Sequence, residues 1–269
     1  MHNIYKYEAT GNDFILMKET PKNPSKFAQM VCDRHFGIGA DGILFPSESK
    51  SADIKMNYYN ADGTVAPMCG NGIRAFSKFL HDQKIINKEQ LHIETLAGIM
   101  IVTKENDLYE VNMGNAQTNL KHPDILKPQH DLEVVTLKVD KHLIDVYVLN
   151  LGTLHTIVLT NDLNQYDDLA DQLCHHPFFP NRSNINFVKV IDKNHLELKT
   201  YERGVGWTLS CGTGSSASQY LTYVLGLTND CVDIKVPGGQ LKVRVENEKV
   251  YLKGPAQLIA NISFQRGLI

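Results

Sequence analysis

The sequence contains one unit twice, and this internal repeat limits the folds open to the chain. A Cys-Gly-x-Gly run stands at residues 69–72 and again at 211–214, and in each copy the cysteine lies ten residues after a tyrosine. The same offset of 141 to 142 residues relates a glycine loop and apolar run at 11–16 to another at 152–157. Solenoids and propellers repeat every roughly 20 to 50 residues. The sequence therefore predicts a duplicated domain and not an array of small repeats.

Both copies predict strands and helices in the same order. Amphipathic helices, recognised by apolar residues at i, i+3, i+4 and i+7, are expected at 27–35 and 166–174, and again at 73–80 and 217–225. Alternating or apolar runs predict strands at 43–45, 54–58, 99–104, 108–113, 185–187 and 196–200, with a last hairpin around 247–248. Gly226 is expected to end the last helix. Each half is therefore expected to be an α+β unit with two helices.

We expect two topologically equal α+β domains that join near residue 117. The N-terminal half covers residues 1–116, the C-terminal half covers 117–256, and residues 257–269 return to the first half. A duplication of this kind predicts a pseudo-twofold axis, with the two Cys-Gly-x-Gly turns facing each other across a central cleft. The active site is expected in that cleft.

Composition argues against several classes of partner. Of the 269 residues, 42% are hydrophobic and 21% are charged, which is typical of a soluble globular protein with a buried core. A net charge of −3 gives no reason to expect a nucleic acid or an anionic membrane as partner. No apolar run reaches the roughly 18 residues that a membrane helix needs. Glu8 and Asp13, near the start of the chain, do not fit a secretory signal.

The five cysteines predict reduced thiols. An odd number of cysteines without a secretory signal favours the cytoplasm over a disulfide framework. Cys32 and Cys174 stand on apolar helix faces and are expected to be small core residues, whereas Cys231 has no counterpart in the other half and is expected to be structural. The sequence has no Cys-x-x-Cys pair, His-Glu-x-x-His motif or P-loop, so it predicts neither a metal nor a nucleotide.

Cys69 and Cys211 are expected to open helices, and this position suits acid–base chemistry. A thiol at a helix N-terminus lies beside unpaired N–H groups and the positive end of the helix dipole, which lowers its pKa from about 8.5 to as little as roughly 3.5. The N–H groups of the glycine turns also suit an anion such as a carboxylate. One such run alone is more often a turn than a catalytic site, but two in register favour catalysis.

Two thiols on opposite sides of one carbon can invert it. One thiolate removes a proton while the opposite thiol delivers a proton to the other face, and the glycine turns stabilise the charge that spreads into a carboxylate. The sequence therefore predicts a racemase or epimerase that needs no cofactor. A disulfide between Cys69 and Cys211 is the alternative under oxidation, and a reducing cytoplasm argues against it.

The chain resembles the diaminopimelate epimerase family over nearly its whole length. The similarity rests on Gly-Asn-Asp-Phe at 11–14, Phe-Gly-Ile-Gly-Ala-Asp-Gly at 36–42, Asn-Ala-Asp-Gly at 60–63, Met-Cys-Gly-Asn-Gly-Ile-Arg at 68–74, Glu-Arg-Gly at 202–204 and Cys-Gly-Thr-Gly at 211–214. The resemblance implies that each half is a curved sheet or barrel around a central helix. It also implies the cofactor-independent conversion of LL- to meso-diaminopimelate, for lysine and peptidoglycan biosynthesis.

The resemblance assigns roles to residues of this chain. Cys69 and Cys211 are expected to be the acid–base pair, and His155 and Glu202 to tune the two thiols. Arg203 is expected to bind the distal carboxylate of the substrate through two parallel hydrogen bonds. The implied substrate contacts are Asn12, Asn60, Gly70, Asn71, Asn184, Glu202, Arg203, Gly212 and Thr213. Taken singly, the asparagines would be turn residues, Arg203 a surface ion pair and His155 a core histidine, but together they favour a site.

Two residues depart from the family pattern and leave the substrate open. Thr153 stands where the family usually has an asparagine that contacts the distal end of the substrate, and Trp207 stands where it usually has glutamate. A tryptophan four residues before Cys211 is expected to reshape the mouth of the pocket. The sequence therefore leaves open a related racemase of another amino acid such as histidine, and a non-catalytic small-molecule-binding protein on the same scaffold. It also leaves open whether the chain forms a homodimer.

Overall fold

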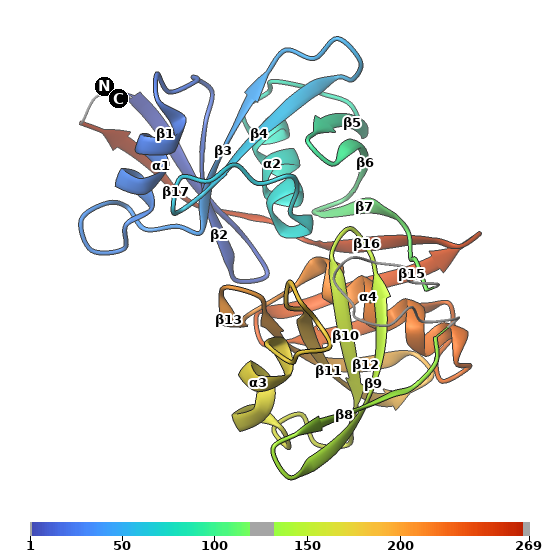
Figure 1. Ribbon diagram of the computed structural model, residues 1–269. Coiled ribbons are helices and arrows are strands. Elements are labelled where there is room, and N and C mark those ends of the chain that lie inside the picture. The colour runs from blue at the N-terminus through green and yellow to red at the C-terminus, as the bar shows by residue number, and fades with distance from the viewer. Residues whose placement is uncertain (1, 119–131, 266–269) are drawn as a thin grey trace. The chain divides into compact units, whose positions relative to one another are not determined.

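The computed structural model describes residues 2–118 and 132–265, in two compact units (Figure 1). Unit 1 contains the residues up to Asn112 and those from Lys253 onwards, and unit 2 runs from Met113 to Leu252. Two parts of the expected halves, at 119–131 and 266–269, lie outside the described residues.

The strands of unit 1 pair in a mixed order. Its elements are β1 (His2–Ala9), β2 (Asn12–Met17), α1 (Pro24–Cys32), β3 (Gly42–Ser47), β4 (Ile54–Asn60), α2 (Gly70–Asp82), β5 (Gln90–Thr95), β6 (Gly98–Glu105), the first part of β7 (Leu108–Asn115) and β17 (Gln257–Phe264). β1 lies antiparallel to both β17 and β2, β2 runs parallel to β3, β3 antiparallel to β4, and β4 parallel to β5. The pairs β5–β6 and β6–β7 are antiparallel. The last described strand of the chain thus pairs with the first.

The strands of unit 2 follow the same plan. Its elements are β8 (Val135–Val139), β9 (His142–Asn150), β10 (Leu154–Leu159), the 3₁₀ turn η1 (Asp167–Leu169), α3 (Ala170–Cys174), β11 (Asn184–Asp192), β12 (His195–Glu202), β13 (Gly206–Thr208), α4 (Gly212–Val224), β14 (Cys231–Val236), β15 (Gly239–Glu246) and the first part of β16 (Lys249–Pro255). β9 lies antiparallel to β8 and β10, β10 runs parallel to β11, and β11 antiparallel to β12. β12 runs parallel to β14 and antiparallel to β13, and β14 antiparallel to β15.

Corresponding elements of the two units are spaced as the sequence repeat predicts. In both units an antiparallel pair is followed by parallel, antiparallel, parallel and antiparallel pairs. β2 begins at Asn12 and β10 at Leu154, and α2 begins at Gly70 and α4 at Gly212, so each counterpart begins 142 residues later. The predicted α+β class and the predicted strands are confirmed.

The helices of unit 1 pack on different faces of its strands. α1 packs against β3 and β4, in a core that includes Phe27 and Ile4. α2 packs against β1, β2 and β17, where Phe79 contacts the rings of Tyr5 and Tyr7. Neighbouring residues of a strand point to opposite faces, so β1 contributes Ile4 to one core and the two tyrosines to the other. The N-terminus of α2, which carries the first Cys-Gly-x-Gly turn, is therefore held by a buried helix.

Two of the predicted helices were wrong in extent. α1 ends at Cys32, and His35, expected on its apolar face, is exposed. The carboxylate of Asp33 accepts the backbone N–H groups of His35 and Phe36, a local turn that replaces the next helical hydrogen bonds. In unit 2 the helix expected over 166–174 is the 3₁₀ turn η1 followed by only five residues of α3.

The apolar stripe predicted for α4 was also wrong in part. Ala217 and Leu221 are buried, but Val224 is 50% exposed. The buried face is largely polar instead, and its residues are Ser215, Ser216, Ser218, Gln219 and Thr222. Gln219 satisfies part of this face because it donates to the Asn229 carbonyl and accepts from neighbouring threonine hydroxyls. The Ser215 and Ser216 hydroxyls, in contrast, have no hydrogen-bond partner among the described residues. The expected stop at Gly226 is confirmed by its positive φ of 69° after the last turn.

Candidate functional site

Cys69 and Cys211 each cap the helix that follows them. The Sγ of each cysteine accepts the N–H of the glycine three residues on, Gly72 or Gly214, at 3.4 Å. A capping side chain satisfies one of the four donors left open at a helix N-terminus. Cys211 is buried and Cys69 half-buried. The prediction that both cysteines open helices is confirmed.

Asn12 lies beside Cys69 with a defined orientation. Its Oδ1 is 3.6 Å from the sulfur, and its Nδ2 donates to Asp41. Asp41 also accepts the Asp13 N–H at 3.1 Å and Arg34 Nη2 at 2.8 Å. Because Asp41 accepts from three donors, the Asn12 amide turns its N–H₂ to Asp41 and its oxygen to the sulfur.

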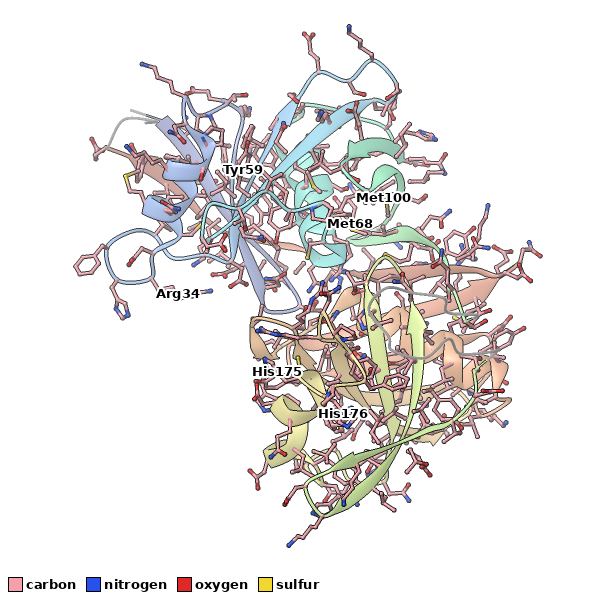
Figure 2. All side chains as sticks on the ribbon, viewed as in Figure 1. Arg34, Tyr59, Met68, Met100, His175 and His176 are labelled. Carbon is pink, nitrogen blue, oxygen red and sulfur yellow. The ribbon has the colours of Figure 1, made fainter. Side chains whose placement is uncertain are left out.

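Two cations hold Asp13 and Asp41 in place. Arg34, labelled in Figure 2 in the loop after α1, donates to both oxygens of Asp13 at 2.9 and 3.2 Å. Lys6 Nζ lies 2.9 Å from the same carboxylate. Burial acts to raise the pKa of Asp13, but the hydrogen bonds from Arg34 and Lys6 outweigh it, and the pKa is lowered. The bonds to Asp13 in turn raise the pKa of Arg34. The support behind Asn12 is therefore rigid and charged.

The other site residues predicted in unit 1 lie on α2 and at the end of β4. Gly70 and Asn71 form the first turn of α2 and are buried. Asn60 ends β4, and its Nδ2 donates to Thr64 Oγ1 at 3.0 Å within its own turn. A contact of Asn60 with a substrate stays a prediction.

His155 is fully buried at the centre of a polar network in unit 2. Its Nδ1 lies 3.1 Å from Asn186 Nδ2, and its Nε2 lies 3.0 Å from Thr153 Oγ1. Asn186 Nδ2 also donates to the Thr156 carbonyl at 3.3 Å, and its Oδ1 accepts the Thr200 hydroxyl at 3.1 Å. An amide nitrogen only donates, so His155 Nδ1 accepts and the ring carries its proton on Nε2.

The donors and acceptors around Thr153 determine, in the same way, where its hydroxyl proton points. Its Oγ1 accepts from His155 Nε2 and from Asn184 Nδ2, which is 3.3 Å away. Asn184 cannot turn over, because its Oδ1 accepts the backbone N–H of Arg203 at 2.9 Å. A hydroxyl has two acceptor lone pairs and one proton to donate. The Thr153 hydroxyl is therefore a donor directed at a further acceptor.

The protonation of His155 gives a pH dependence of stability. Burial lowers the pKa of His155 to about 3, and the charge of Arg203 acts in the same direction. Between that value and the ordinary pKa of about 6.5, the unfolded chain binds a proton that the folded protein excludes, so stability rises with pH. We expect the free energy of unfolding to fall by about 1.4 kcal/mol for each pH unit below about pH 6 through this residue.

Urea unfolding between about pH 4.5 and 6 measures this contribution. The slope of the free energy of unfolding against pH is compared between the parent and His155→Gln. The difference between the two slopes gives the contribution of His155, because the other titrating groups are common to both proteins. His175, which is exposed, supplies the control variant His175→Gln, for which the parent slope is expected. Equal slopes for the parent and His155→Gln would contradict the prediction.

Arg203 and Glu202 follow one another at the end of β12 but make different contacts. Arg203 is exposed and donates to the Asn181 carbonyl at 3.0 Å, and no carboxylate within the described ranges pairs with it. Glu202 Oε1 accepts the Thr208 hydroxyl at 2.8 Å. Arg203, Asn184 and Thr153 thus form one connected group at the edge of unit 2.

Trp207 does not share the face of Glu202. Its ring packs against Tyr201 and Phe187, with centroids 5.5 and 5.8 Å apart, and Lys199 Nζ lies 4.5 Å above it. Tyr201 packs on the core of unit 2 that contains α3. Residues alternate in direction along a strand, so Trp207 and its neighbour Thr208 point to opposite faces. Trp207 therefore lies on the face opposite to that of Glu202, and its effect on the mouth of the pocket stays a prediction.

The sequence did not single out Asn186, Thr200 or Arg34 as parts of these networks. Asn184 and Asn186 stand two residues apart at the start of β11, where the first five residues are all buried. Residues two apart share a face, so two buried asparagines at this spacing were a readable signal of a polar network. Thr200 and Arg34 carried no such signal, because the side chains that they bond, Asn186 for Thr200 and Asp13 and Asp41 for Arg34, stand on other segments of the chain.

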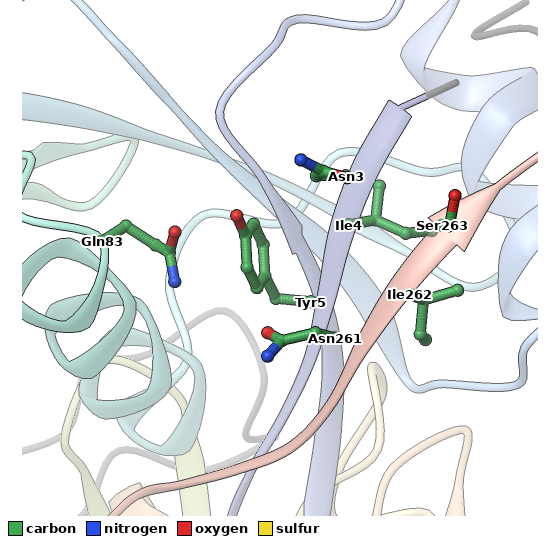
Figure 3. A pocket seen from close by; sticks show the side chains of 7 residues that line it. All are labelled: Asn3, Ile4, Tyr5, Gln83, Asn261, Ile262 and Ser263. Carbon is green, nitrogen blue, oxygen red and sulfur yellow. The ribbon is translucent and has the colours of Figure 1, made fainter.

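A shallow pocket in unit 1 lies away from these residues (Figure 3). It is lined by Asn3, Ile4, Tyr5, Gln83, Asn261, Ile262 and Ser263. Gln83 caps the C-terminus of α2, so the pocket is at the opposite end of that helix from Cys69. In the described ranges no group of three His, Cys, Asp or Glu side chains is placed to hold a metal ion. No described helix is long and apolar enough to span a bilayer.

Comparison with known proteins identifies the family. The family model described as diaminopimelate epimerase matches residues 4–119 and 147–259. The diaminopimelate epimerase of Alkaliphilus metalliredigens is 35% identical over 98% of this chain and 98% of its own length, and that of Halothermothrix orenii is 36% identical over 94% of each. A solved phenazine biosynthesis protein of the PhzF family from Bacillus anthracis has a TM-score of 0.71 at 17% identity, over 97% of this chain and 98% of that one, and so shares the fold. Matches of this extent in both halves of the sequence show that the chain belongs to the diaminopimelate epimerase family.

Proposed function

We propose that this isomerase converts LL- to meso-diaminopimelate with Cys69 and Cys211 as its acid–base pair. The observation that carries the proposal is that each cysteine caps a helix and accepts the N–H of the glycine three residues on. This environment favours a thiolate. A chain with two such sulfurs in corresponding positions is equipped for proton transfer on both faces of one carbon.

In the proposed mechanism one sulfur starts as thiolate and the other as thiol. The C–H bond of the substrate breaks as its proton moves to the thiolate, and the opposite S–H bond breaks as its proton moves to the other face of the carbon. N–H groups at the starts of α2 and α4, from Gly70 and Asn71 and from Gly212 and Thr213, bind the α-carboxylate and the charge that spreads into it. No external cofactor takes part in this proposal.

The proposal requires the two units to act as pseudo-symmetric halves, each a curved sheet or barrel around a central helix, that close over one substrate. The halves are the copies at 1–116 and 117–256, with 257–269 assigned to the first. Closure excludes water from a carbanion. The reducing cytoplasm predicted from the odd cysteine count suits two working thiols. A homodimer stays a prediction, which sedimentation equilibrium tests.

The distal end of the substrate is assigned to unit 2. Arg203 offers an exposed guanidinium, and Thr153 and Asn184 lie in the same hydrogen-bonded group. The Thr153 hydroxyl is a fixed donor, so it suits the distal carboxylate and retains the contact that the family makes with asparagine. His155 orients that hydroxyl, and Glu202, at the end of β12 and bonded to Thr208, is assigned to tune the thiols.

Removing the guanidinium of Arg203 is expected to weaken substrate binding. Arg203→Met is expected to raise KM for LL-diaminopimelate about 100-fold with a smaller change in kcat, since two charge-assisted hydrogen bonds are lost. Steady-state kinetics measure this. Arg182, an exposed arginine outside the strands and next to Asn181 in the sequence, gives the matched control Arg182→Met, with parental KM expected. A parental KM in Arg203→Met would show that Arg203 does not bind the substrate.

Hydrogen exchange in heavy water tests the function itself. The reduced protein is incubated with LL-diaminopimelate, and separately with a panel of L-amino acids that includes lysine and histidine, and α-hydrogen exchange is followed by NMR. Exchange and inversion confined to diaminopimelate are expected. Exchange only on another amino acid would show that this amino acid, and not diaminopimelate, is the substrate. No exchange on any of them would favour a non-catalytic binding protein.

A further inference from the structure

Arg74 is a fully buried cation on the helix that a proposed catalytic sulfur caps. It belongs to the first turns of α2, five residues after Cys69, and its side chain is 0% exposed. Its three hydrogen bonds go to neutral oxygens: the Gly70 carbonyl at 3.0 Å, the Thr10 hydroxyl at 3.0 Å and the Pro255 carbonyl at 3.4 Å. In the part of the chain that the structure describes, no carboxylate pairs with it.

A buried charge without an opposite charge is costly. Transfer of an ion from water to a protein interior disfavours the charged form strongly unless a counterion compensates it. Burial accordingly lowers the pKa of Arg74 to about 10, and the charges that Cys69 and Glu8 carry when ionised act in the opposite direction. Glu8 accepts the Gly11 N–H, and among the described residues the partners of the guanidinium are the three neutral oxygens and not the Glu8 carboxylate. Of these two charges, that of the sulfur at the start of the same helix has the larger effect on Arg74.

We propose that Arg74 is a positioning residue whose buried charge favours the thiolate form of Cys69. The inference rests on the proposed two-thiol function. When Cys69 is the base, the charge of Arg74 is compensated before the substrate proton arrives. When Cys69 delivers its proton, the S–H bond breaks, and the charge of Arg74 favours the thiolate that remains.

Asn12 acts against Arg74. Its oxygen faces the sulfur, and Asp41 prevents the amide from turning over, so Asn12 favours the S–H form of Cys69. The other charged groups on elements that pack against this end of α2 are Lys6, Glu8 and Asp13, and Lys6 and Asp13 pair with each other. β3 and β17 carry no charged residue. Two groups that favour opposite protonation states of Cys69 suit a sulfur that must act as the base in one direction of the epimerisation and as the acid in the other.

Alkylation by iodoacetamide tests the proposal without substrate, because only the thiolate reacts. The rate of labelling of Cys69 and of Cys211 is measured separately by peptide mass spectrometry across a range of pH. In Arg74→Met, Cys69 is expected to react about tenfold more slowly near pH 7, the factor that a shift of one unit in a titration midpoint produces. Arg74→Lys, which keeps the charge, is expected to restore most of the rate.

Asp41→Asn is expected to have the opposite effect. The amide introduced by this substitution can donate to Asn12 Oδ1, so the Asn12 amide is able to turn its N–H₂ to the sulfur. Cys69 labelling then rises by about fivefold, the factor that one ordinary hydrogen bond is worth. Asp53→Asn is the matched control, because Asp53 also accepts a lysine and a backbone N–H but lies away from Cys69. Parental labelling is expected there.

The direction in which each variant changes the rate of Cys69 labelling distinguishes the proposal from a loss of packing. Loss of packing alone would move Arg74→Met and Asp41→Asn the same way, and that result, or unchanged Cys69 labelling in Arg74→Met, would overturn the proposal. If Arg74→Met fails to fold, the comparison of Asp41→Asn with the parent still tests the opposing effect of Asn12. The two proposals can fail separately. Failure of the epimerase function would appear as no α-hydrogen exchange on diaminopimelate, whereas the alkylation rates of Cys69 would still report the effect of Arg74.

Discussion

Cys69→Ser and Cys211→Ser are each expected to lower kcat for epimerisation by at least about 10³-fold, within the range that a positioned acid or base contributes. A serine hydroxyl can replace the sulfur as cap of α2 or α4, so each variant is expected to fold. It does not ionise near neutral pH, so it cannot remove the α-proton. The measurement is the appearance of meso-diaminopimelate from LL-diaminopimelate by chiral chromatography.

The exposed Cys231, first residue of β14, supplies the control for these variants. Cys231→Ser is expected to keep parental activity. A single remaining thiol can still remove and return a proton on one face, so one stereoisomer is expected to exchange its α-hydrogen without inversion in each serine variant. Activity within about tenfold of the parent in either variant would rule out the two-thiol mechanism.

Gly214→Ala is expected to lower the free energy of unfolding by about 2 to 3 kcal/mol, as overpacking of a well-filled interior does. A Cβ at this position would overlap Asn186 Oδ1 far inside van der Waals contact. Asn186 cannot retreat without breaking its bonds to His155 and Thr200. Urea unfolding measures the loss, and the KM for diaminopimelate is expected to rise with it because the Thr153 hydroxyl loses its support.

Gly72→Ala, at the corresponding position of unit 1, is the matched comparison. Its Cβ would meet the Phe14 ring at 3.2 Å and the Cys69 Cβ at 3.4 Å, which a small shift of the ring relieves. A loss of about 1 kcal/mol or less is expected, at the low end of overpacking. Equal losses in the two variants, or a larger loss in Gly72→Ala, would contradict the contrast between the two turns.

Elements that keep a period over several turns were predictable from sequence. The strands and the starts of α2 and α4 follow hydrophobic periodicity and glycine turns, which are local signals. α4 shows the limit of this approach. Its buried face is polar because Gln219 and Thr222 bond to each other and to the chain after the helix. Periodicity counts apolar residues and cannot register buried polar side chains, such as Gln219 and Thr222, that tertiary hydrogen bonds satisfy.

The site residues also divide into those that local sequence signals predict and those that depend on tertiary contacts. The helix starts at Cys69 and Cys211 could be read from a motif, because a cap depends on neighbouring residues. The role of Thr153 could not, because its hydroxyl is oriented by a chain of bonds through His155 and Asn186 from three separate strands. Trp207 shows a related limit: its distance along the sequence from Cys211 does not specify which face of β13 its side chain occupies, and the ring contacts with Tyr201 and Phe187 became known only from the structure.

The pairing of β17 with β1 has a consequence for how the protein is made. Unit 2 is encoded between the two parts of unit 1, and β1 pairs with β17 from His2 to Glu8. Domains fold as units while the chain emerges from the ribosome, so unit 2 has all its strands before the partner of β1 has been synthesised. Until then β1 exposes the backbone groups of a strand edge, which invite pairing with other chains. The second half of the gene therefore encodes the half of the protein that is able to fold first.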